Sequence, residues 1–213
     1  MKRLLLLALL PALLTAQIKY FVSGGTMVSS ASSTSGTESP LAHYWSNGAA
    51  LAIGMEKRIL PTIDFRATLG YAYLPYKSYG EQQPPREAMS VGLADPAAYT
   101  LVAADGDASS VVRLMIEGVY SEPLSGPLEL LLSTGVGATM GSVGNIRATW
   151  MSNSGMTTRY TLRFSESVYL VHSAGLGLRY SLVGGIAVET AVKYYSNYTD
   201  RMQYSFMVGA LVQ

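Results

Sequence analysis

The sequence contains no cysteine, so no disulfide bond can hold the folded chain together. Charged residues make up only 14% of its 213 residues, and the formal net charge is +1. Charge this sparse and this balanced excludes the basic surface that nucleic-acid-binding proteins present. We therefore expect no nucleic acid among the partners of this protein.

Long apolar runs are missing as well, except at the N-terminus. There, Lys2 and Arg3 form a basic segment, Leu4–Leu14 is apolar, and Thr15 and Ala16 offer a small-residue cleavage site. The apolar segment is too short for a membrane-spanning helix, which needs about 20 residues. A buried N-terminal helix is the alternative. We expect residues 1–16 to be a signal peptide and residues 17–213 to form one exported domain.

Tyrosine and glycine are abundant, with 15 tyrosines against 4 phenylalanines and 21 glycines. Tyrosine has an apolar body and a polar tip, which suits a boundary between hydrocarbon and water. An exported protein without disulfides is held either by a large core or by a closed sheet in a membrane. The composition favours the second arrangement.

Alternation of apolar and polar residues with a period of two recurs along the chain, and it predicts strands. Tight connections rich in Pro or Gly occur at 59–61, 122–126 and 182–185, and long polar ones at 29–45, 75–108 and 142–164. Short turns on one side and long loops on the other are typical of outer-membrane barrels. The last connection, 199–200, is the exception. The predicted strands are 18–28, 46–58, 62–74, 109–121, 127–141, 165–181, 186–198 and 201–213.

The two faces of each strand differ in chemistry. In TIDFRATLGYAY, residues 62–73, apolar Ile63 and Phe65 alternate with Asp64 and Arg66. Such charges are tolerable inside a barrel when they form a paired network. We therefore predict an all-β, eight-stranded antiparallel up-and-down transmembrane barrel with its charges in the lumen. Glu56 and Arg58 share the inward face, and the expected network is Asp64, Arg66, Arg113, Glu117, Glu129, Arg179, Glu189 and Lys193.

Alternation alone does not separate this barrel from a soluble sandwich or a lipocalin-like barrel. The placement of aromatic residues does, because outward-facing aromatics are predicted to gather at both strand ends. Two such rings are the girdles expected at the two interfaces of a bilayer. The ring at the turn end is Tyr20, Phe65, Tyr120 and Tyr180, and the ring at the loop end is Tyr71, Tyr73, Tyr194 and Tyr204.

The signal peptide, the eight strands, the long loops and the closing strand MQYSFMVGALVQ together resemble the small outer-membrane barrels of the OmpX and OmpA-transmembrane type. Such barrels usually finish on an aromatic residue read by the assembly machinery, whereas this sequence stops at Gln213. The resemblance implies a monomer in the outer membrane of a Gram-negative-type bacterium. It also implies contact with outer-membrane lipids, insertion by the barrel-assembly machinery and no cofactor.

Three motifs allow a second interpretation. His172 beside Ser173 suggests a lipid-modifying enzyme, but neighbouring residues of a strand face opposite ways, so an interfacial histidine is favoured. Asp105-Gly106-Asp107, with Asp95 nearby, suggests a calcium loop but lacks its closing glutamate, so a surface turn is favoured. The stretch 43–45 and Trp150 are expected to be interface anchors rather than a recognition patch.

The leading functional hypothesis is a non-enzymatic barrel that anchors extracellular loops for surface interaction or envelope integrity. Its lumen is expected to be filled by salt bridges, because side chains nearly fill eight-stranded barrels. Glu117 and Glu129 are the candidate partners of Arg113. A narrow channel and a lipid-modifying enzyme are the alternatives. A ligand is expected to bind through loops 29–45, 75–108 and 142–164.

Overall fold

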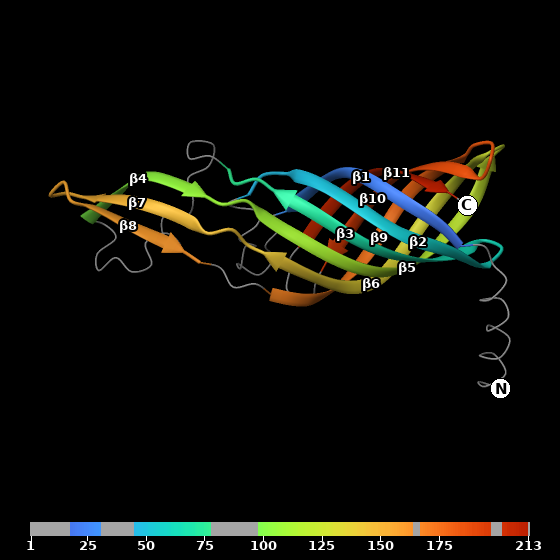
Figure 1. Cartoon of the computed structure of the whole chain (residues 1–213), viewed down its shortest axis with the longest axis horizontal. Coiled ribbons are helices and arrows are strands. Elements are labelled where there is room, and N and C mark those ends of the chain that lie inside the picture. The colour runs from blue at the N-terminus through green and yellow to red at the C-terminus, as the bar shows by residue number, and fades with distance from the viewer. Residues whose placement is uncertain (1–17, 31–44, 78–97, 164–166, 197–201, 213) are drawn as a thin grey trace, which may run out of the picture.

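The computed structural model describes residues 18–30, 45–77, 98–163, 167–196 and 202–212. The predicted signal peptide, residues 1–16, lies outside these ranges. The described residues form eleven strands (Figure 1). In chain order they are β1 (Ile18–Ser30), β2 (Gly48–Leu60), β3 (Ile63–Leu74), β4 (Tyr99–Gly106), β5 (Ser109–Ser125), β6 (Leu128–Ser142), β7 (Ile146–Ser152), β8 (Thr157–Leu162), β9 (Ser167–Ser181), β10 (Ile186–Ser196) and β11 (Met202–Val212).

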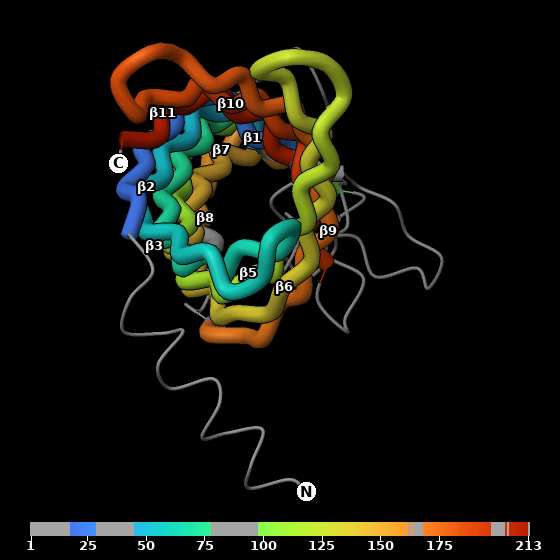
Figure 2. Tube along the Cα trace, turned by 90° about the vertical axis from the view of Figure 1, so that its right-hand side faces the viewer, coloured from blue at the N-terminus to red at the C-terminus, as the bar shows by residue number. Residues whose placement is uncertain are grey.

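Eight of the strands close into an antiparallel barrel in the order β1-β11-β10-β9-β6-β5-β3-β2. Viewed along its axis, the barrel is a closed ring (Figure 2). Pairing between the first and last strands closes it, with a register that runs from Tyr20 opposite Val212 to Ser30 opposite Met202. Closure leaves no unpaired edge in the barrel wall. The predicted fold class is confirmed, and the strand boundaries differ from those predicted by only a few residues.

The tight turns lie at one end of the barrel, where β2 meets β3, β5 meets β6 and β9 meets β10 (Figure 1). Gly126 has φ 54°, and Gly184 and Gly185 have φ 84° and 79°. These left-handed conformations suit glycine because it has no Cβ, so the turn can be this short. The predicted tight turns are confirmed.

The prediction that 75–108 and 142–164 are loops is wrong at 99–106, 146–152 and 157–162, and residues 78–97 lie outside the described ranges. They contain β4, β7 and β8, which form a three-stranded sheet in the order β4-β7-β8. This sheet, called the projecting sheet below, extends beyond the barrel at the end opposite the tight turns (Figure 1). The Ser, Thr and Gly content of these segments is typical of loops, but Thr also suits a strand.

The apolar residues of the projecting sheet explain why it folds. Ile146, Ala148 and Trp150 alternate along β7 and are buried, while Arg147 and Met151, at alternate positions, are exposed. The buried face packs in one continuous cluster with apolar residues from the loop end of the barrel interior. The sheet is therefore a folded continuation of the barrel. The barrel residues of the cluster are Met27, Ala50, Ala72, Leu74, Val111 and Met207.

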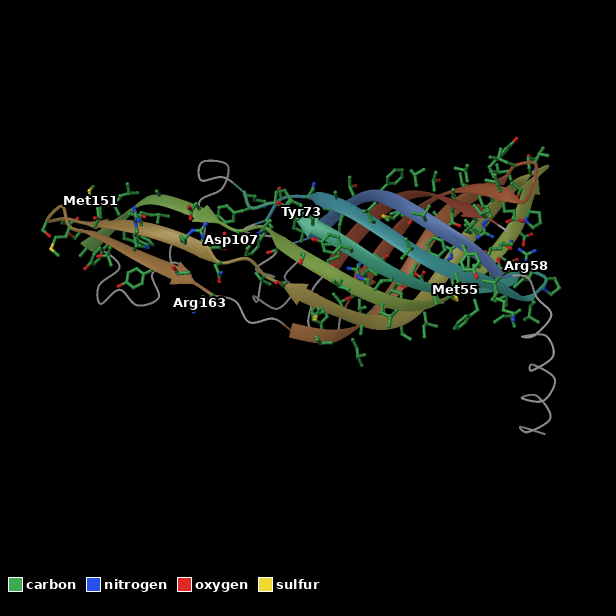
Figure 3. All side chains as sticks on the ribbon, in the orientation of Figure 1. Met55, Arg58, Tyr73, Asp107, Met151 and Arg163 are labelled. Atoms are coloured by element: carbon green, nitrogen blue, oxygen red, sulfur yellow. The ribbon has the colours of Figure 1, made fainter. Side chains whose placement is uncertain are left out.

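The barrel wall is apolar outside and polar inside. Leu51, Ile53 and Met55 of β2 are 61%, 57% and 50% exposed, whereas Glu56 and Arg66 are 1% and 2% exposed. Side chains seen in Figure 3 project outward from the strands, Met55 and Tyr73 among those labelled. A water-soluble protein has the opposite arrangement, so the outer face suits hydrocarbon.

Within the ranges described, no helix is long and apolar enough to cross a membrane.

Candidate functional site

The interior of the barrel contains two groups of polar contacts. The first, near the tight turns, is centred on Arg66 of β3. Its Nε and Nη2 donate to Oε2 of Glu56 at 2.9 and 2.6 Å, and its Nη1 and Nη2 donate to the two oxygens of Glu189 at 2.7 Å each. The guanidinium lies over the ring of Phe21, 4.8 Å from its centroid. Arg66 thus ties β2 to β10 across the lumen.

Arg179 of β9 joins the same carboxylates from the other side. Its Nη2 donates to Glu56 at 2.8 Å and to Glu189 at 3.1 Å, and its Nη1 donates to Asp64 at 3.3 Å. Asp64 also accepts two hydrogen bonds from Arg58, whose side chain is 41% exposed. Shared carboxylates and bidentate arginines make this a connected network rather than separate pairs.

The eight residues expected in the network omitted Glu56, which the structure places at its centre. Glu56 and Asp64 have fully buried side chains, and each contacts two arginines. Glu129, which was expected, lies at the margin with a side chain 25% exposed and 3.8 Å from Arg179. Alternation indicates that a residue faces inward, but depth along the strand decides whether water reaches it.

The second group of contacts lies nearer the loop end. Lys193 of β10 donates to Glu117 of β5, and the hydroxyl of Ser173 donates to the same carboxylate at 3.0 Å. Gly135 of β6 leaves space here, because a Cβ on it would lie 2.7 Å from Cγ of Glu117. The side chains of Lys193 and Glu117 are both buried.

Arg113 pairs with neither of its predicted partners. Its guanidinium donates to Oε1 of Gln203 and, at 3.3 Å, to the hydroxyl of Thr139. It lies over the ring of Tyr195, 3.7 Å from the centroid. Glu117 is paired with Lys193, and Glu129 lies near Arg179 at the turn end. Among the described residues, no carboxylate lies within 4 Å of Arg113.

Sequence reasoning missed the inward aromatics Phe21 and Tyr195, each of which lies under an arginine. A Cβ on Gly54 would lie 2.6 Å from the ring of Phe21, so this glycine makes room for it. The alternation along each strand could have identified them, since both aromatics lie on the same face of their strand as charged residues. An aromatic face gives a buried cation partial compensation without an opposite charge.

The residues expected to form the aromatic girdles lie on the outside at both ends of the barrel wall. At the turn end, Tyr120 is opposite Ile63 and Tyr180 is opposite Leu128. The exposed fractions of Tyr20, Phe65, Tyr120, Tyr180, Tyr71 and Tyr73 range from 39% to 62%, and Tyr194 is half-buried. The backbone of Tyr204 is opposite Tyr194, and its side chain lies outside the described part of the structure.

His172 and Ser173 lie on opposite sides of the wall, His172 exposed and Ser173 bonded to Glu117 inside. The register instead places Ser196 of β10 opposite His172. Besides Ser196, the register of β6, β9 and β10 brings Val136, Leu170, Ala174 and Tyr194 close to His172. None of these four has a carboxylate to orient a histidine, so these positions do not supply a catalytic triad.

Trp45 and Trp150 were expected to anchor the protein at the membrane interface, and this prediction is wrong. They are 2% and 0% exposed and belong to the core of the projecting sheet. The indole N–H of Trp45 donates to the carbonyl of Asp107 at 2.9 Å, and its ring meets Tyr76 edge-on at 6.2 Å. Burial, with Asp105 nearby, raises the pKa of Tyr76. His43 and Tyr44 lie outside the described residues.

Both aspartates of the stretch Asp105-Gly106-Asp107 form ion pairs with Arg147. Nε of Arg147 donates to Asp105 at 2.8 Å and its Nη2 donates to Asp107 at 3.0 Å, and these hydrogen bonds raise the pKa of the guanidinium. Asp107 lies where the barrel strands give way to the projecting sheet (Figure 3). Asp95 lies outside the described residues. In the described part of the chain, no group of three or more acidic or histidine side chains could hold a metal ion.

No family model matches the chain, and no curated protein matches it in sequence. Solved structures do match it over most of its length. Neisserial surface protein A matches at 11% identity over 92% of this chain and 97% of its own, with a TM-score of 0.51. Ail of Yersinia pestis, in complex with the heparin analogue sucrose octasulfate, matches at 12% identity over 91% and 97%, with a TM-score of 0.47. The outer membrane enzyme PagL matches at 12% identity over 92% and 99%, with a TM-score of 0.41.

At these identities the likeness concerns the fold, and one fold supports many functions. The match to Neisserial surface protein A agrees with the closed eight-stranded barrel and its apolar outer face. The chain has the fold of the small eight-stranded β-barrels of bacterial outer membranes, as its sequence predicted.

Proposed function

We propose that this protein is a non-enzymatic barrel of the outer membrane that holds a folded sheet outside the cell for interaction with an external partner. Residues 1–16 direct its export, the barrel-assembly machinery inserts it, and it acts as a monomer. The observation that carries this proposal is the projecting sheet. Long loops need no packed core, whereas Ile146 and Trp150 of this segment pack in one cluster with Trp45 and the loop end of the barrel.

The two faces of the projecting sheet support a role in presentation. One face is packed, while the other carries polar and charged residues, with Asp105 of β4 opposite Arg147 of β7. Arg147 and Thr149 continue to Thr161 and Arg159 on β8. An ordered polar surface can bind a partner without the entropy cost of first ordering a loop.

The interior of the barrel favours an anchor over a channel. Arg66, Arg179 and their carboxylates cross the lumen at the turn end, and the apolar cluster around Leu74 and Val111 fills it at the loop end. Eight strands enclose a space that side chains nearly fill. These contacts support a lumen that is obstructed at both ends.

Surface labelling tests the proposed orientation and the exposure of the projecting sheet. An epitope inserted at Asn153, in the β7–β8 connection, should be recognised by antibody on intact cells. A matched epitope inserted after Gly126, in the β5–β6 turn, should be recognised only after the outer membrane is opened, because short turns face the periplasm. Recognition of the turn epitope alone on intact cells would contradict the proposal.

A further inference from the structure

A cavity lies inside the barrel between the turn-end charges and the loop-end apolar cluster. Its volume is about 60 Å³, which is enough for a few water-sized occupants. Its lining includes Arg66 and Glu189 on one side and Met27, Val111 and Met207 on the other. Arg113 and Lys193 line it between these two sides.

The basic residues that line the cavity differ in their partners. Arg66 is bonded to two carboxylates, and Lys193 is bonded to Glu117. Arg113 is 8% exposed, and its partners are the neutral groups of Gln203, Thr139 and Met27 and the ring of Tyr195. A buried cation compensated only by dipoles attracts an anion strongly, because little water is present to screen it.

Two hydroxyl groups point to the same conclusion independently of charge. Thr68 and Ser205 are 7% and 4% exposed and line this cavity. The hydroxyl oxygen of each is buried and has no hydrogen-bond partner. Buried polar groups are nearly always satisfied, so an occupant of the cavity is expected to accept hydrogen bonds from them.

The distribution of charge along the lumen adds a third reason. The turn-end network holds Glu56, Asp64, Glu129 and Glu189 against Arg58, Arg66 and Arg179. The second group of polar contacts, called the loop-end group here, contains one acid, Glu117, and two bases, Lys193 and Arg113. Among these ion-paired residues, acids outnumber bases in the turn-end network, and bases outnumber acids among the charged residues that line the cavity, which are Arg66, Arg113, Lys193 and Glu189. A single negative charge would balance the loop-end group.

We propose that the cavity binds a small inorganic anion of the halide class, held by the guanidinium of Arg113 and the hydroxyls of Thr68 and Ser205. The ring of Tyr195 fixes the guanidinium from one face and Gln203 fixes one of its edges. The proposal does not depend on the function of the projecting sheet. A halide suits the site because it accepts hydrogen bonds from several directions and needs little space.

Bromide identifies the occupant directly, because its anomalous scattering distinguishes it from water. The wild-type protein is refolded and crystallised in sodium bromide, so that the anion need not enter a closed barrel afterwards. We expect one anomalous peak in the cavity within hydrogen-bonding distance of Arg113. A cavity that holds only water under these conditions would overturn the proposal.

Solution measurements extend the test beyond crystals. At equal ionic strength, the urea midpoint of unfolding should be higher in bromide than in gluconate, which is too large for the cavity. The shift should be lost in Arg113→Gln and kept in Arg58→Gln, whose arginine lies at the turn-end margin. An equal shift in all three proteins would show a general salt effect and would contradict the proposal. If Arg113→Gln does not fold, the presence or absence of the anomalous bromide peak in the wild-type crystal decides the question.

Discussion

At the scale of single residues, the position of a charge within the lumen network decides its importance. Arg66 makes four hydrogen bonds to two buried carboxylates. Removing one partner of a buried ion pair typically costs about 3–5 kcal/mol, because the other charge is left uncompensated. We therefore expect Arg66→Ala to lower the free energy of unfolding by about this amount, measured by urea titration of the protein in lipid vesicles.

Arg58→Ala is the matched control, since Arg58 belongs to the same network but its side chain is 41% exposed. Asp64 keeps Arg179 as a partner in this variant. The loss of stability should be less than half of that for Arg66→Ala. Equal losses for the two variants would mean that the network does not depend on burial.

At the scale of the elements, the free-energy cost of a charge on the outer face of a strand should depend on its depth in the membrane. Leu114 and Leu124 both face outward from β5 and are 58% and 52% exposed. Leu114 lies between the two girdles, opposite Leu69, whereas Leu124 lies beyond Tyr120 on the turn side. Leu114→Arg should lower the free energy of unfolding by about 2–4 kcal/mol and Leu124→Arg by about 0–1 kcal/mol.

The measurement is again urea unfolding in vesicles of fixed lipid composition. Both variants make the same chemical change in the same strand, Leu114 in a regular part of the ladder and Leu124 at the register shift between Pro123 and Ser125. A cost at Leu124 as large as that at Leu114 would contradict the assignment of the hydrocarbon band.

The projecting sheet should depend on the buried residues of its own strands. Trp150 is fully buried, whereas neighbouring Met151 is 42% exposed and lies at the far end of the sheet (Figure 3). Trp150→Ala should loosen the sheet, since large-to-small core changes cost about 3–5 kcal/mol. Trypsin should then cleave after Arg147 and Arg159 faster than in wild type, while Met151→Ala changes nothing. Unchanged cleavage of Trp150→Ala would show that Trp150 does not hold the sheet.

At the scale of the whole molecule, the barrel could be predicted from sequence because one physical rule applies along every strand. Residues such as Ile63 and Phe65 meet hydrocarbon while Asp64 and Arg66 face the lumen, and the period of two reports this directly. The partner of Arg113 could not be predicted, because long side chains reach across the lumen to strands distant in sequence, as Arg113 does to Gln203.

The projecting sheet was missed for a different reason. Its strands are short, and its core is shared with residues far away in the sequence, so IRATWMS contains only three alternating apolar residues. A short alternation within Ser- and Thr-rich sequence is difficult to distinguish from a loop. Trp45 and Trp150 were misplaced as a result, because tryptophan beside a predicted strand end is also typical of a membrane interface.

Planar-bilayer conductance of the refolded wild-type protein tests the central claim most directly, since a barrel with both ends of its lumen obstructed differs from a channel in this property above all. The turn-end network crosses the lumen, the loop-end apolar cluster packs at its other end, and a cavity of about 60 Å³ lies between them. We predict that insertion into the bilayer produces little or no stable current. A large, stable and ion-selective conductance would contradict the obstructed lumen and would favour a channel over an anchor.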